Sequence, residues 1–197
     1  MTTRNGDLYL GANRNAGYNS TGRTYRFHHW EEPVPDFQKI GTILINSSVA
    51  LLCNIDIPQT FTHLMLEGAG ALASSTGTLD LRFNDDSTAS NYMSIRVTNA
   101  AAQSKVEYLT NGGAPIATIG TTLAPFKVWI PNYRGAHIKS VLVTHGFSGA
   151  SGIQRIASVW NNTAAITKIG AIFNSVGAPL TTSTIDVYGI NGQGRYW

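Results

Sequence analysis

Residues 79–97 read LDLRFNDDSTASNYMSIRV and contain two strand-like runs around one polar turn. In residues 79–83 every second side chain is apolar, and residues 92–97 alternate in the same way. Side chains of a β-strand point alternately to its two faces, so this period of two predicts half-buried strands. Residues 84–91 supply the Asn, Asp and Ser side chains that favour tight turns. The stretch therefore predicts antiparallel β-structure.

Similar short runs continue along most of the chain, separated by Gly, Asn and Pro. About eleven of them are expected to be strands: residues 41–45, 49–57, 61–67, 79–84, 92–97, 105–110, 126–130, 139–144, 153–160, 166–173 and 184–190. No segment has a sustained period of 3.6, and only residues 100–104 leave room for a helical turn. Many short strands with turns between them predict an all-β fold, an antiparallel jelly-roll-like β-sandwich.

The composition of the 197 residues agrees with this fold class. Gly, Ser, Thr and Asn make up more than a third of the chain, and only 13% of it is charged. This is neither the composition of a helical protein nor that of a disordered one. A hydrophobic content of 43% is enough to bury a core. The length predicts one domain, or one domain with an arm.

Several classes of protein are excluded by what the sequence lacks. No apolar run approaches the roughly 18–20 residues of a membrane helix, so no membrane insertion is expected. Residues 1–7 contain no apolar h-region of a signal peptide, which predicts synthesis in a cytoplasm. The single cysteine, Cys53, excludes a disulfide framework and a four-cysteine zinc site. Cys53 ends an apolar run, residues 49–53, and is expected to be an inert buried thiol.

Residues 1–35 differ from the rest of the chain and predict an extended N-terminal arm. They lack a strand or helix period, are rich in Arg and aromatic residues, and end at a Pro-Val-Pro boundary. Because Arg and aromatic side chains are enriched in interfaces, eight residues are expected to dock the arm on a partner: Arg4, Tyr9, Arg14, Tyr18, Arg23, Tyr25, Arg26 and Trp30. A mobile solvated arm is the alternative. Nucleic-acid binding is disfavoured because the cationic residues do not cluster.

The predicted organisation is completed by a sandwich domain over residues 36–190 and a tail over residues 191–197. Tyr196 and Trp197 in the tail are expected to be a second docking or oligomerisation element, with a frayed tail as the alternative.

No constellation of catalytic residues is recognisable, and the chain is expected not to be an enzyme and to need no cofactor. Asp85, Asp86 and Asn91 offer oxygen ligands for an ion such as calcium, but a turn with side-chain hydrogen bonds explains the same residues. The ion stays an open alternative. His63 and His145, like His137, are scattered and are expected to be strand or loop residues. Residues 68–73 fit a relaxed dinucleotide-binding pattern without the helix that it needs, so a loop is expected there.

Three segments together resemble small virion proteins of tailed bacteriophages. They are IPQTFTHLMLEG at residues 57–68, LRFNDD at 81–86 with Asn91-Tyr92, and VWNNTAAIT at 159–167 with STIDVYGI at 183–190. The resemblance covers about residues 36–190 and implies a jelly-roll-like sandwich on the virion surface. The motifs themselves are expected to be core and turn residues, with Phe83 and Tyr92 as an aromatic pair across a hairpin.

Two functions follow from the resemblance. One is a capsid decoration (cement) protein that binds and stabilises the outer shell through its N-terminal arm. The other is a tail-fibre, fibre-adaptor or receptor-binding module, whose loops at residues 111–120 and 146–152 would contact the host. Decoration is favoured because the chain is short and has no fibre shaft.

The resemblance also implies partners and a location. The expected partners are the major capsid protein or tail proteins of the same virion, further copies of the chain in a trimer or dimer, and, for the receptor-binding function, a host surface glycan or protein. The chain would be made in the host bacterial cytoplasm.

Overall fold

The computed structural model describes residues 2–4, 7–9, 37–45, 53–73, 76–100, 103–109, 112–147, 152–174 and 183–192. The chain divides into two compact units, Met1–Val34 and Pro35–Trp197. In the first unit, β1 (Thr2–Arg4) pairs antiparallel with β2 (Asp7–Tyr9), so this part of the predicted extended arm forms a small hairpin.

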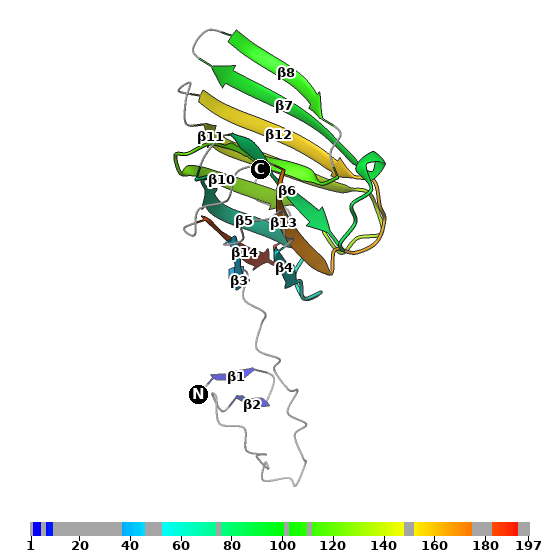
Figure 1. Ribbon diagram of the computed structural model, residues 1–197. Helices are drawn as coiled ribbons and strands as arrows, with labels where there is room; N and C mark the ends of the chain where they lie inside the picture. Colours follow the sequence, from blue (N-terminus) through cyan, green and yellow to red (C-terminus); the bar gives the residue numbers. More distant parts are fainter. Residues whose placement is uncertain are drawn as a thin grey trace. The chain divides into compact units, whose positions relative to one another are not determined.

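The second unit is a β-sandwich of two antiparallel sheets, which confirms the predicted all-β fold (Figure 1). The large sheet has eight strands in the order β3 (Phe37–Ile45), β14 (Ser183–Ile190), β5 (His63–Gly70), β10 (Ala124–Ile130), β11 (Lys139–Phe147), β12 (Gly152–Trp160), β7 (Tyr92–Ala100) and β8 (Gln103–Leu109). The small sheet has four, in the order β4 (Cys53–Asp56), β13 (Lys168–Asn174), β6 (Gly77–Phe83) and β9 (Ala114–Ile119). A short 3-10 helix, η1 (Ala89–Asn91), precedes β7.

The core lies between the two sheets, because each sheet turns the apolar side of its strands inward. β10 alternates between buried and exposed residues along its length, and β6 buries Leu79, Leu81 and Phe83 completely. The Phe83 ring packs against Tyr92 and Trp160, with centroids 6.2 and 5.5 Å away. The predicted contact between Phe83 and Tyr92 is therefore confirmed, although their strands belong to different sheets.

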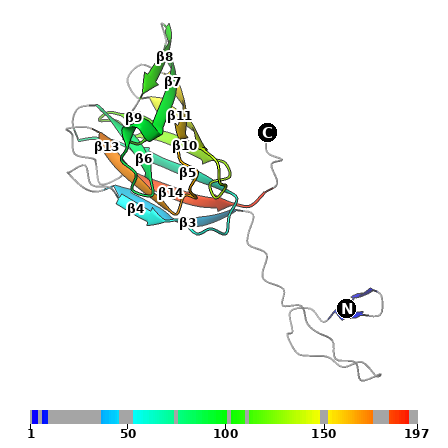
Figure 2. The ribbon, with the colours of Figure 1, turned by 90° about the vertical axis from the view of Figure 1, so that its right-hand side faces the viewer.

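The two sheets differ in width, and this difference shapes the surface. Figure 2 shows the β7–β8 end of the large sheet extending past the small sheet. The inner face of the large sheet is covered by the small sheet elsewhere, while its outer face has no second layer among the described residues. The outer face is therefore where the fold leaves strand side chains open to a partner.

The prediction of a loop at residues 111–120 is wrong, because Ala114–Ile119 form β9, an edge strand of the small sheet. Ala114, Ile116 and Ile119 are fully buried. The run is short and lies among Gly, Pro and Thr, which hide its strand character in the sequence. Burial of its apolar residues against the large sheet decides its conformation.

Two further local predictions are corrected. Ala100, Gln103 and Ser104, where a helical turn was expected, are instead paired residues of β7 and β8; for Ala100, sheet pairing overrides the helix propensity of alanine. Gly68 and Gly70 belong to β5 rather than to a loop. A side chain at Gly68 would meet the carbonyl oxygen of Thr184 on β14, so close strand approach explains this glycine. Cys53 opens β4, and its side chain lies outside the described part of the structure.

Candidate interaction surface

The polar turn after β6 is a connection between the two sheets, not the hairpin expected from the sequence. It carries Asp86, whose Oδ2 accepts hydrogen bonds from Trp160 Nε1 and Asn91 Nδ2, both at 2.8 Å. Its Oδ1 accepts one from the Thr88 main-chain N–H at 2.9 Å. Partial burial opposes ionisation, but these hydrogen bonds outweigh it and lower the pKa of Asp86 to about 2. Asp86 thus fastens the turn to β12.

Asn84 fastens the same turn to the small sheet. It has a positive φ of 53°, which asparagine tolerates better than most residues. Its Oδ1 accepts hydrogen bonds from the main-chain N–H groups of Thr167 and Lys168 at 2.8 and 3.1 Å. Its Nδ2 donates to the Ala165 carbonyl at 2.8 Å. These hydrogen bonds therefore fix the turn against the segment that leads into β13.

The ion-binding alternative at this turn competes with protein donors. Asp85 Oδ2 pairs with Lys168 Nζ at 2.7 Å, and Asp85 Oδ1 accepts a hydrogen bond from Asn54 Nδ2 at 3.1 Å. Asp86 uses both carboxylate oxygens as described above. In the ranges that the structure describes, no group of three or more His, Cys, Asp or Glu side chains could hold a metal ion. The geometry is that of a structural turn.

The motif at residues 57–68 also contacts the motif at residues 183–190. Phe61 covers Gly189 of β14 so closely that a side chain at Gly189 would overlap the Phe61 ring. His63 accepts a hydrogen bond from the Asn132 N–H through Nδ1 at 3.0 Å, and its Nε2 lies 3.3 Å from the Gly192 carbonyl, to which it can donate. The motif residues thus have internal structural contacts, as expected of core and turn residues.

Lys139 is a buried amine that also serves the fold. Its side chain is fully buried at the start of β11, where burial lowers its pKa. Nζ donates to the carbonyls of Gly135 and His137 at 2.6 Å and approaches that of Thr163 at 3.4 Å. These acceptors replace the water that an ammonium group loses on burial. Lys139 therefore fixes the turn between β10 and β11.

A row of mostly apolar side chains crosses the outer face of the large sheet. Strand register places seven residues opposite one another from β14 to β8: Tyr188, Met65, Trp129, Leu142, Ala157, Ile95 and Tyr108. Neighbours in such a row are close enough for their side chains to touch. The row is therefore one continuous surface feature rather than scattered residues.

At the β12–β7–β8 end of the large sheet, polar side chains face inward and apolar side chains face outward, the reverse of the rest of the sheet. On β7 the inward residue Ser94 is buried and polar, while Met93, Ile95 and Val97 point outward and are exposed. Six large apolar side chains form what we call the outer patch: Met93, Ile95, Val97, Val106, Tyr108 and Ile153. Their exposed fractions run from 41% to 81%. An exposed apolar cluster of this kind is a candidate interaction site.

The inner side of the same end contains a buried polar cluster. The Thr118 N–H donates to His145 Nε2 at 3.1 Å, and Thr118 Oγ1 accepts a hydrogen bond from Arg96 Nη1 at 2.8 Å. Thr118 Oγ1 is also 3.3 Å from Gln154 Oε1. Burial lowers the pKa of His145, although hydrogen bonds with Pro125 and Thr118 oppose this effect. The end of the sheet is thus polar inside and apolar outside.

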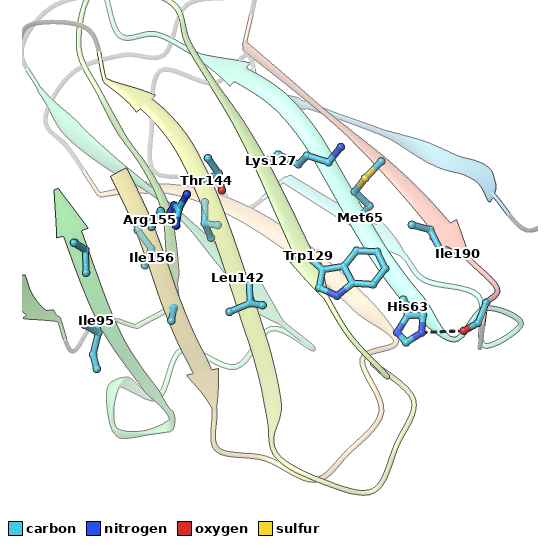
Figure 3. A pocket seen from close by; sticks show the side chains of 14 residues that line it. His63, Met65, Ile95, Lys127, Trp129, Leu142, Thr144, Arg155, Ile156 and Ile190 are labelled. Carbon is cyan, nitrogen blue, oxygen red and sulfur yellow. Dashed lines mark hydrogen bonds between the residues drawn. The ribbon is translucent and has the colours of Figure 1, made fainter. Parts of the chain in front are cut away.

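The row also crosses a groove of about 900 Å³, which we call the outer groove and which shares Ile95 and Val97 with the outer patch. Met65, Trp129 and Leu142 line it together with Ile190, and Figure 3 shows them on neighbouring strands. The His63 and Trp129 rings stack with their centroids 5.1 Å apart. Further polar groups in the lining come from three residues: Lys127, Thr144 and Arg155. The groove therefore combines apolar and aromatic surface with a few charged groups.

None of the docking residues expected from the sequence is among the described residues of the outer groove or the outer patch. Arg4 is in β1 and Tyr9 in β2. The others fall outside the described residues: Arg14, Tyr18, Arg23, Tyr25, Arg26, Trp30, Tyr196 and Trp197. The docking roles stay predictions.

Neither the outer groove nor the outer patch was predicted from the sequence. A signal was present in strands with apolar residues on both faces, such as Val141-Leu142-Val143, and in Met93-Ser94-Ile95-Arg96-Val97, where polar and apolar residues alternate. Alternation does not say which face is inside, so the reversal on β7 could be recognised only from the structure.

Comparison with protein-family models, curated proteins and solved structures finds no match to this chain. No helix in the described ranges is long and apolar enough to span a membrane. The interpretation of function therefore rests on the residues themselves and on their arrangement.

Proposed function

We propose that this chain is a structural protein of a bacteriophage virion, a decoration protein that binds the outer shell through its N-terminal unit and through the outer patch. The observation that carries the proposal is the outer patch. Full burial of a large apolar side chain contributes about 1.5–3 kcal/mol, so burial of these six partly exposed side chains against a partner would stabilise an assembly.

The recognisable motifs are compatible with this function because their roles are internal. Asp86, Asn84 and Phe61 hold the two sheets, the turn and β14 together. Side chains engaged in this way are poorly placed to act on a substrate. Surfaces outside the motifs are left for assembly, in keeping with the resemblance.

The receptor-binding alternative has lost one of its two supporting loops. Residues 111–120 were expected to contact the host, but Ala114–Ile119 are a strand whose apolar residues are buried. A buried edge strand cannot present a host-binding loop. This favours decoration over the fibre module.

The test is the copy number in purified particles of the phage that carries this chain. Quantitative mass spectrometry should give a number comparable to that of the major capsid protein. Particles that lack the protein should release their DNA at a lower temperature, because binding to the closed shell alone stabilises it by mass action. A few copies per particle, with sound heads and lost adsorption, would instead identify a tail module.

A further inference from the structure

We infer that residues 193–197 fold back over the outer groove of their own chain, with Tyr196 and Trp197 packed against Trp129 and Leu142. This inference goes beyond the proposed function and does not depend on it. It assigns the Met65–Leu142 side of the outer groove to the segment and leaves the outer patch, which shares Ile95 and Val97 with the groove, open to another partner.

The position at which the main chain leaves β14 is the first argument. Ile190 ends the strand, and both Ile190 and Gly192 line the outer groove. The His63 ring, which also stacks on Trp129, lies within hydrogen-bonding distance of the Gly192 carbonyl (Figure 3). The next residues therefore start at the rim of the groove.

The reach of the segment is the second argument. Adjacent strands lie about 4.8 Å apart, so Trp129 on β10 is about 10 Å from β14 and Leu142 on β11 about 14 Å. Four residues of extended chain span about 13–14 Å and five about 17 Å, which brings Tyr196 and Trp197 over both. Ile95 on β7 is about 24 Å away and lies out of reach. The segment can cover the side of the groove from Met65 to Leu142, but not its far side, where Ile95 and Val97 also belong to the outer patch.

The chemistry of the segment is the third argument. Tyr and Trp each have a large apolar body with one polar group, which suits apolar walls near Thr144 and Arg155. Gly194 gives the main chain the freedom to turn back. Because the segment is attached at the rim, its effective concentration at its own groove is in the millimolar range, well above that of another copy in dilute solution. Its own groove is thus the favoured site.

Disulfide trapping in the full chain tests the inference. We would pair Tyr196→Cys with Leu142→Cys, and in a matched control with Tyr108→Cys. Leu142 and Tyr108 are exposed positions in the same cross-strand row, but Tyr108 is six strands from β14. Mild oxidation should form the first pair within one chain in high yield and the control pair at least tenfold less. Peptide mapping by mass spectrometry separates these products from bonds to Cys53.

The other outcomes would overturn the inference. A bond between residues 142 and 196 that forms only between chains would assign the groove to a second copy. Equal yields for the two pairs, or no bond in either, would show that the segment does not occupy the groove. Circular dichroism of the reduced variants verifies that each is folded before oxidation.

A second measurement does not use cysteine. Deletion of residues 193–197 should raise the fluorescence of a dye that binds apolar surface several-fold at low protein concentration. The matched control, Arg195→Ala, keeps both aromatic residues and should leave the fluorescence near that of the unchanged chain. Equal dye fluorescence with and without the segment would contradict the inference.

Discussion

The turn of residues 84–91 and the outer face of the large sheet differ in what their side chains contact. In the turn, Asp86 and Asn84 use their polar atoms on donors and acceptors of the same chain. On the outer face, Ile95 and Tyr108 expose large apolar surfaces. The turn belongs to one of the motifs on which the resemblance rests and its contacts serve stability, whereas the outer face leaves apolar surface open to a partner. Substitutions in the two regions should therefore have opposite consequences.

The largest effect on stability is expected at Trp160, which is 1% exposed and links the core to Asp86. Trp160→Ala should lower the free energy of unfolding by about 3–5 kcal/mol, because it opens a cavity and removes a hydrogen bond. Trp129→Ala on the outer face should cost less than half as much. Urea unfolding of both variants measures the difference. Equal losses would show that the outer face is as important to the fold as the core.

A smaller effect is expected at the hydrogen-bonding centre of the turn. Asp86→Asn removes the charge that accepts bonds from Trp160, Asn91 and Thr88, and should cost about 1.5–3 kcal/mol. The folded-state pKa of Asp86, about 2, is below its usual 3.8. Its ionised form therefore stabilises the fold above about pH 4, and this contribution is lost as the pH falls toward 2.

The control for the turn is an exposed residue beside it. Ser87→Ala is expected to change stability by less than about 0.5 kcal/mol, as surface substitutions usually do. Unfolding curves at pH 7 and at pH 3 should show that the gap between Asp86→Asn and the unchanged chain narrows in acid. A gap that is independent of pH would contradict the assignment to ionised Asp86.

The buried polar cluster gives a further pH effect at milder acidity. Burial lowers the pKa of His145, so the unfolded chain binds a proton more readily than the folded one. Stability from the neutral ring is present above about pH 6.5 and should be lost as the pH falls below it, by at most about 1.4 kcal/mol per pH unit. His145→Gln keeps an acceptor for the Thr118 N–H. Its melting temperature should therefore change less between pH 7 and pH 5 than that of the unchanged chain. An equal dependence of melting temperature on pH in the variant and in the unchanged chain would contradict this effect of His145 on stability.

Much of the fold could be predicted because alternation and turn residues are local properties. The strands at residues 79–83 and 92–97 and the contact between Phe83 and Tyr92 follow from such local signals. β9 could not be predicted, because its burial depends on the large sheet. The reversed polarity of β7 could not be predicted for the same reason. Ser94 forms a hydrogen bond with Ser158 on the neighbouring strand, so strand register decides which side of β7 faces the core.

The smallest effect on stability, and the largest on assembly, is expected in the outer patch. Ile95→Lys combined with Val106→Lys should change the free energy of unfolding by less than about 1 kcal/mol, because both side chains are already exposed. The charges should prevent burial against a partner and abolish binding to the shell, measured by sedimentation with particles that lack the protein. Thr122→Lys, at an exposed bend outside the patch, adds charge without this loss. Normal binding of the double variant would remove the outer patch from the interface and leave the N-terminal unit as the sole attachment.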